Sequence, residues 1–130
     1  MDMSTWKILL VDDEAEFINT LAERLDIRGI SARVVYDGDA ALKAVAEEVP
    51  QAMVLDVMMP GIKGLDVLQR VKEEHPEVQV ILLTGQGKTR DGIEGMRYGA
   101  FAYLMKPLDL EELITTLGEA ISATQGTPHA

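Results

Sequence analysis

Five polar side chains stand at or near the ends of short apolar runs, and together they could bind a metal ion and accept a phosphoryl group. They are Asp12, Asp13, Asp56, Thr84 and Lys106. Three clustered carboxylates repel one another, and a hard divalent cation such as Mg²⁺ offsets that repulsion. A carboxylate can also be the nucleophile that forms an acyl phosphate, a reaction that depends mainly on positioning and charge neutralisation. A metal ion, a lysine and a hydroxyl around one aspartate supply both.

The apolar pattern predicts the elements that must position these residues. Short apolar runs alternate with segments in which apolar residues recur at helical spacing. We expect strands at 7–11, 32–36, 53–57, 78–83 and 101–105, and helices at 14–27, after Asp37, at 64–74, at 89–98 and after Asp109. Asp37 is a suitable N-cap, and Asp109 with Glu112 fits a capping box. The chain therefore alternates strictly between strand and helix.

This alternation predicts an α/β domain with a five-stranded parallel, doubly wound sheet of the flavodoxin-like kind. The expected strand order is 2-1-3-4-5, in a three-layer α/β/α arrangement. In such a sheet the carboxyl ends of the strands lie along one edge, where ligands bind. A lone aspartate or lysine at a strand end is usually a turn, cap or solvated residue. Here four of the five expected strands carry a polar group at the same edge, so we expect the five side chains to share one crevice.

Composition narrows the classes of protein further. The 130 residues, of which 47% are apolar, fit one globular domain, which we place at 1–123 with a flexible tail at 124–130. A net charge of −10 disfavours direct binding to nucleic acid. There is no cysteine for a disulfide or thiolate metal site. No apolar run approaches the roughly 18 residues of a membrane span, so we expect a cytoplasmic protein without membrane insertion.

Four segments, in order along the chain, resemble the receiver domain family of two-component response regulators. They are Leu10-Val-Asp-Asp-Glu14, Asp56-Val-Met-Met-Pro-Gly61, Leu83-Thr-Gly85 and Lys106-Pro107. The resemblance runs from about Lys7 to Ile121, nearly the whole chain. It implies a phosphorelay protein with Mg²⁺ as cofactor, phosphorylated by a sensor histidine kinase or a histidine phosphotransfer protein. It also implies a protein that catalyses only its own aspartyl phosphorylation and dephosphorylation and controls an unidentified downstream partner.

The resemblance also implies a role for each matching residue. Asp56 would be the phosphoacceptor, with Thr84 and Lys106 binding the phosphoryl group. The metal ligands would be Asp12, Asp13, Asp56 and the backbone carbonyl of Met58. Thr84 and Tyr103 would form the conformational switch, and the peptide bond before Pro107 would be cis. Met58 departs from family members that have a side chain able to orient water, which predicts slow loss of the phosphoryl group.

Three other classes of protein are alternatives to this interpretation. An aspartyl-phosphate phosphatase needs an acid two residues after its nucleophile, where this chain has Met58. Phosphate-binding loops of nucleotide-binding proteins need glycine where Leu82 or Arg90 stands. A degenerate receiver, which binds a partner without being phosphorylated, stays open as the alternative.

Two glycines interrupt the expected helix at 89–98. Gly92 and Gly95 each cost up to about 1 kcal/mol of helix stability relative to alanine. Because a switch needs an element near a two-state balance, we expect this helix to be the most labile in the domain.

Overall fold

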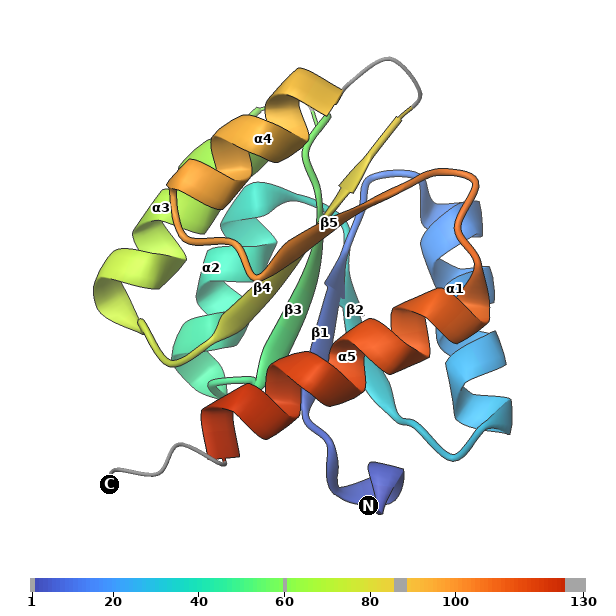
Figure 1. Ribbon diagram of the computed structural model, residues 1–130. Coiled ribbons are helices and arrows are strands. Elements are labelled where there is room, and N and C mark those ends of the chain that lie inside the picture. The colour runs from blue at the N-terminus through green and yellow to red at the C-terminus, as the bar shows by residue number, and fades with distance from the viewer. Residues whose placement is uncertain (1, 60, 86–88, 126–130) are drawn as a thin grey trace.

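The computed structural model describes residues 2–59, 61–85 and 89–125. A parallel sheet runs through the middle of the molecule in the order β2-β1-β3-β4-β5, with helices on both faces (Figure 1). The strands are β1 (Ile8–Val11), β2 (Ala32–Val35), β3 (Ala52–Asp56), β4 (Gln79–Thr84) and β5 (Ala102–Met105). The helices are α1 (Ala15–Ile27), α2 (Gly38–Glu47), α3 (Gly64–Glu74), α4 (Thr89–Arg97) and α5 (Leu110–Gln125). The expected fold class and strand order are confirmed, and the bounds differ from the prediction by a few residues at most.

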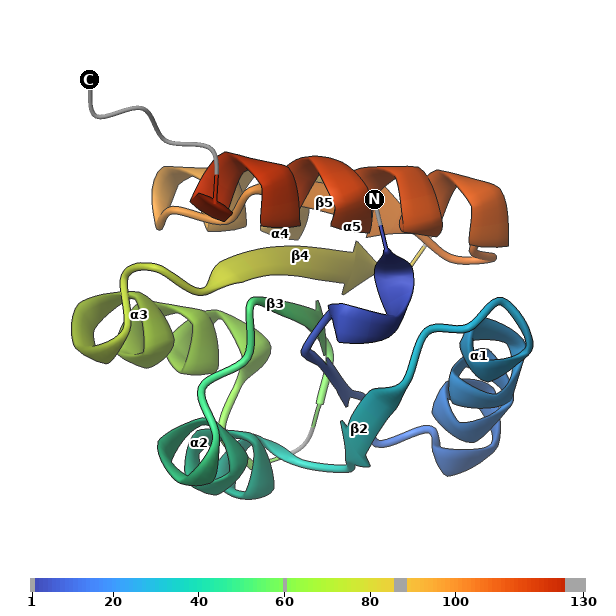
Figure 2. The same ribbon diagram turned by 90° about the horizontal axis from the view of Figure 1, so that it is seen from below.

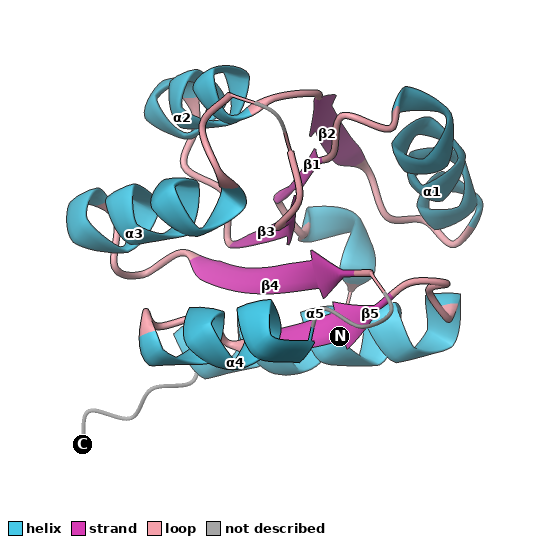
Figure 3. Ribbon diagram, turned by 90° about the horizontal axis from the view of Figure 1, so that it is seen from above, coloured by secondary structure: helices cyan, strands magenta, loops and turns pink. Residues whose placement is uncertain are grey.

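The strands are apolar on both sides because both faces of the sheet are covered. Alternate residues of each strand belong to different core clusters: Leu9 and Val11 pack beneath α2 and α3, whereas Ile8 and Leu10 pack beneath α1 and α5. Views along the sheet show α2, α3 and α4 on one face and α1 and α5 on the other (Figures 2 and 3). This two-sided burial is the physical reason for continuous apolar runs in place of alternating ones.

Local sequence explains several helix ends. The side chain of Asp37 accepts a hydrogen bond from the backbone N–H of Ala40 and so caps α2. The Asp109 carboxylate accepts from the backbone N–H groups of Glu111 and Glu112 at the start of α5. A short 3₁₀ helix, Met3–Thr5, which the sequence pattern did not predict, is capped by Asp2.

The structure gives the end of helix α5, near the predicted boundary between the domain and its C-terminal tail. Helix α5 continues to Gln125, and residues 126–130 lie outside the described part of the chain. The division into a domain at 1–123 and a tail therefore stays a prediction. Within the described residues, no helix combines the length and apolarity needed to cross a membrane.

Candidate functional site

The register of the sheet brings the strand-end residues to one level. Val11 of β1 pairs with Leu55 of β3, so Asp12 and Asp56 follow side by side. Asp56 pairs with Leu83 of β4, so Thr84 lies one step further along the same edge. Thr84 in turn pairs with Met105 of β5, which directly precedes Lys106. Strands β1 and β3 are also where the strand order switches, which is the usual ligand position in such sheets.

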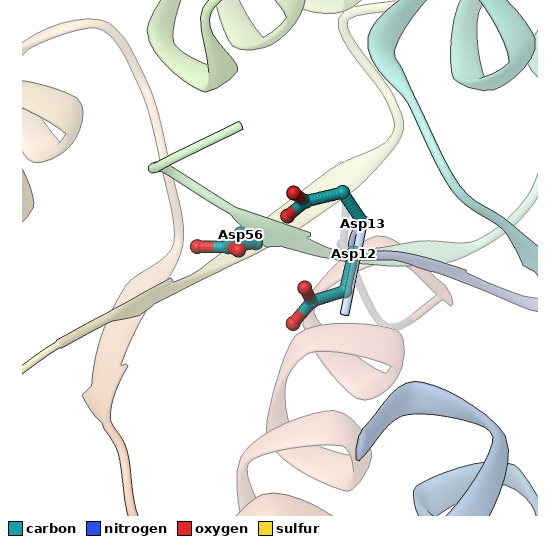
Figure 4. A group of neighbouring side chains, drawn as sticks. All are labelled: Asp12, Asp13 and Asp56. Carbon is teal, nitrogen blue, oxygen red and sulfur yellow. The ribbon is translucent and has the colours of Figure 1, made fainter. Parts of the chain in front are cut away.

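Three carboxylates gather at this switch point. Asp12 and Asp13 at the end of β1 point toward Asp56 at the end of β3 (Figure 4). One oxygen from each can be chosen so that all three lie within 4.8 Å of one another. Asp12 is fully buried and Asp56 is 4% exposed, whereas Asp13 lies open to solvent. A cluster of hard oxygen donors with one solvent-facing member suits a divalent cation that keeps water in its shell.

Two of these aspartates also organise their own loops. Oδ1 of Asp12 accepts a hydrogen bond from the backbone N–H of Glu14 at 2.9 Å, which turns the chain into α1. Oδ1 of Asp56 accepts from the backbone N–H of Met58 at 3.0 Å. In both residues one oxygen is thus tied to the loop, and Oδ2 faces the ammonium of Lys106, 2.9 Å away for Asp12 and 3.7 Å for Asp56.

Burial makes the charge of Asp56 costly. The pKa of Asp56 is raised to about 7, mainly because the carboxyl is removed from water. The hydrogen bond from the Met58 N–H and the charge of Lys106 lower this pKa in part, and the charge of Asp12 raises it. An aspartate nucleophile must be ionised to attack, so the site needs more positive charge than Lys106 supplies. A cation beside the three clustered carboxylates would favour the ionised form of Asp56.

Lys106 is held mainly by acidic groups. Its ammonium donates to Asp12 and, at 2.6 Å, to Glu14, and it lies 4.5 Å from the centre of the Phe17 ring. Burial acts to lower the pKa of this group, but the hydrogen bonds to Glu14 and Asp12 outweigh it and raise the pKa to about 12. The lysine is therefore charged at any physiological pH. The peptide bond between Lys106 and Pro107 is cis.

The hydroxyl of Thr84 lies buried at the end of β4. Its side chain is fully buried, and among the described residues its Oγ1 has no hydrogen-bond partner. A buried hydroxyl with no partner usually costs stability, and such a group calls for an explanation such as a ligand. The position of Thr84 beside Asp56 makes an oxygen of a group attached to Asp56 a suitable partner.

Tyr103 lies on the α4 side of the sheet and is partly buried against the core cluster under α2 and α3. Helix α4 passes directly over its ring, because Gly92 offers no side chain at that point. The candidate switch residue and α4, the helix that we expect to be labile, thus meet at Gly92, a contact that the sequence pattern did not reveal.

The structure therefore brings Asp12, Asp13, Asp56 and Lys106 together and places Thr84 on the same edge. Met58 directs its side chain outward and is 52% exposed. Sequence reasoning missed Glu14 and Phe17 as neighbours of Lys106. Glu14 adjoins Asp13 in the sequence, which was a signal for it, whereas Phe17 belonged to the apolar pattern of a core helix.

Comparison with known proteins agrees with this arrangement. The model of the family described as "Response regulator receiver domain" matches residues 8–118. The transcriptional regulatory protein CpxR of Klebsiella pneumoniae is 40% identical over 85% of the chain, which covers 47% of that protein. The uncharacterized transcriptional regulatory protein YkoG of Bacillus subtilis is 35% identical over 92% of the chain, which covers 52% of it. The chain thus spans about half the length of these curated relatives.

Solved structures of single receiver domains have the same fold as this chain. The receiver domain of NtrX from Brucella abortus superposes with a TM-score of 0.85 at 32% identity, covering 88% of this chain and 98% of that one. A response regulator receiver domain protein from Clostridium thermocellum gives a TM-score of 0.88 at 30% identity, covering 92% and 97%. With a family match over most of its length and a set of acidic, hydroxyl and lysine side chains at the switch of its sheet, the chain belongs to the response regulator receiver domain family of two-component signal transduction.

Proposed function

We propose that this receiver takes a phosphoryl group onto Asp56 from a phosphohistidine of a sensor histidine kinase or a histidine phosphotransfer protein. The observation that carries the proposal is the surroundings of Asp56. Its buried carboxylate lies with two further carboxylates and a lysine ammonium 3.7 Å away, and the same sheet edge holds a hydroxyl that has no partner among the described residues. This set matches what phosphoryl transfer requires, which is positioning and neutralisation of charge.

Each side chain has a task in the transfer. Oδ1 of Asp56 is held by the N–H of Met58, so Oδ2 is the oxygen that attacks phosphorus. The bond between phosphorus and the histidine nitrogen breaks, and its electron pair stays on the imidazole. Lys106 turns its ammonium to the phosphoryl oxygens, and the hydroxyl of Thr84 donates a hydrogen bond to one of them. The protein in this way modifies only itself, and it is not an enzyme in the usual sense.

The carboxylate cluster fits Mg²⁺. We infer that Asp12, Asp13 and Asp56 hold the ion together with the backbone carbonyl of Met58. When bound, the ion neutralises charge on the phosphoryl oxygens and favours the ionised form of Asp56. Asp13, which faces solvent, holds the entry side of the site, whereas buried Asp12 keeps Lys106 nearby through its Oδ2.

Phosphorylation would then alter a surface that other proteins bind. Thr84, drawn to the phosphoryl group, would leave space that the ring of Tyr103 fills, and α4 would follow because it packs on that ring. Such a shift would change the positions of three exposed apolar side chains on α4 and β5, which are Ile93, Met96 and Met105. We propose that the downstream partner binds there, and that protein and phosphodonor meet in the cytoplasm.

Intact mass spectrometry tests the proposal. Wild-type protein incubated with acetyl phosphate and Mg²⁺ should gain the mass of one phosphoryl group, and Asp56→Asn or excess EDTA should abolish the gain. Asp66→Asn, which removes an exposed acid from the first turn of α3, is the matched control and should be phosphorylated like wild type. Folded wild-type protein that takes no phosphoryl group would contradict the proposal and favour a degenerate receiver.

A further inference from the structure

The ammonium of Lys106 contacts a carboxylate that phosphoryl transfer does not require. Its shortest distance is 2.6 Å to Oε1 of Glu14, compared with 2.9 Å to Asp12 and 3.7 Å to Asp56. The ring of Phe17 lies on another side of the same ammonium, with its centre 4.5 Å away. In this structure the lysine is therefore bound more closely to the start of α1 than to the candidate phosphoacceptor.

The start of α1 is built so that both groups reach Lys106. Glu14 is the N-cap residue of α1, yet its side chain makes no capping hydrogen bond, so its carboxylate is available to Lys106. Phe17 follows three residues later and so lies on the same side of the helix. Its ring is partly buried against the core beneath α1 and α5, which fixes its position. A carboxylate and an aromatic ring face together form a favourable binding site for an ammonium group.

We propose that Glu14 and Phe17 hold Lys106 in a resting position and that Glu14 competes with the phosphoryl group for the lysine. This inference rests on the proposed phosphorylation of Asp56. An ammonium has three N–H donors, and in the resting position two of them go to Asp12 and Glu14. Phosphorylation turns a carboxylate of charge −1 into an acyl phosphate of charge about −2 and adds two oxygen acceptors. Lys106 has one N–H donor left for these acceptors, and it must give up Glu14 to offer a second. Glu14 is thus a positioning residue that limits how readily the domain is phosphorylated.

The chain offers a matched pair of variants for the test. Glu14→Gln removes the competing charge, whereas Glu16→Gln removes the same charge from an exposed position in the first turn of α1. At saturating Mg²⁺, Glu14→Gln should bind beryllofluoride, a phosphoryl mimic, about two- to fivefold more tightly than wild type. This is the size expected for loss of an ion pair whose carboxylate side chain is exposed to solvent. Glu16→Gln should bind as wild type does.

Coupling to Lys106 distinguishes competition from simple repulsion of an anion. In a Lys106→Met background Glu14→Gln should leave beryllofluoride affinity unchanged, because no ammonium remains to compete for. An equal gain in that background would overturn the proposal, and so would unchanged or weaker binding by Glu14→Gln alone, which would mean that Glu14 does not restrain the lysine.

The resting position can also be tested without phosphorylation. The ¹⁵N NMR signal of the Lys106 ammonium in the free protein should shift in Glu14→Gln and in Phe17→Leu and stay in place in Glu16→Gln. An unchanged signal in Glu14→Gln would contradict the resting position of Lys106 beside Glu14, whatever the outcome of phosphorylation. If the NMR signals shift as expected but the wild type is not phosphorylated, the proposed function is contradicted, whereas the resting position of Lys106 is supported.

Discussion

The ring of Tyr103 lies directly beneath Gly92 of α4, so close that a Cβ on Gly92 would come within 2.6 Å of the ring carbons Cγ and Cδ1. Gly95, one turn later, likewise has no room for a Cβ because of Leu82. The two glycines therefore let α4 approach β4 and β5 closely. A movement of the Tyr103 ring would therefore displace α4, which is the coupling that the proposed switch requires.

Gly92→Ala should destabilise the domain, although alanine is the better helix former. Overpacking of a tight contact typically costs about 1–3 kcal/mol, which exceeds the gain of up to about 1 kcal/mol in helix propensity. Gly118→Ala in α5 is the control: its added Cβ would meet Trp6 at 3.5 Å, an ordinary contact, so this variant should be more stable than wild type. Urea unfolding measures both free energies. Equal stabilisation by the two substitutions would contradict close packing of α4 on Tyr103.

The raised pKa of Asp56 predicts a pH dependence of stability in EDTA. In the unfolded chain this carboxyl has an ordinary pKa near 3.8, and in the folded protein its pKa is about 7. Between these values the folded state holds the extra proton, so the contribution of Asp56 to stability falls as pH rises from about 4 to about 7. Asp56→Asn should therefore gain stability relative to wild type over this range and hold its advantage above it. Thermal unfolding across pH measures the difference, and a constant difference would show that burial does not raise the pKa.

Mg²⁺ should reverse much of that destabilisation in wild type. Titration calorimetry should show binding that Asp13→Asn weakens by at least about tenfold, since a unit charge beside a divalent ion is worth more than about 1.4 kcal/mol at a protein surface. Asp26→Asn, which alters an exposed acid in α1 remote from the cluster, serves as the control and should bind normally. Equal affinity of the Asp13 and Asp26 variants would remove Asp13 from the metal site.

Met58 predicts a long-lived phosphoryl group. Its exposed thioether side chain is a poor partner for the water that would attack phosphorus, whereas an asparagine amide can hydrogen-bond that water. Met58→Asn should shorten the lifetime of the phosphoprotein about two- to tenfold, the effect of one hydrogen bond. Met96→Asn, the same exchange at an exposed site on α4, should leave the lifetime unchanged. Wild-type decay as fast as that of the Met58 variant would refute the idea.

The sheet could be predicted from the sequence because its signals are local and repeated. Runs such as Met53 to Leu55 are buried on both faces and therefore apolar throughout, and strict alternation with helices leaves few topologies. Parallel pairing then puts every strand end on one edge, which is why Asp12, Asp56 and Lys106 could be assigned to one crevice before any distance was known.

Contacts between side chains of different helices and strands could not be predicted from the sequence pattern. Gly92 and Gly95 were interpreted only as a weakness of helix propensity, because their packing role depends on how near α4 comes to Tyr103 and Leu82. Phe17 lies at an apolar position of the helix predicted at 14–27, and its contact with Lys106 depends on a rotamer that the spacing of apolar residues does not encode. The pKa of Asp56 likewise depends on burial and neighbours in three dimensions.

Phosphorylation as proposed converts Asp56 itself into an acyl phosphate. Borohydride reduces an acyl phosphate to an alcohol, so treating phosphorylated protein with it and sequencing the peptides by mass spectrometry identifies the modified residue. The structure predicts homoserine at position 56 only, with Asp12 and Asp13 intact and no conversion when Mg²⁺ is withheld. Homoserine at position 12 or 13, or efficient labelling of Asp56→Asn, would contradict the assignment of Asp56 as phosphoacceptor.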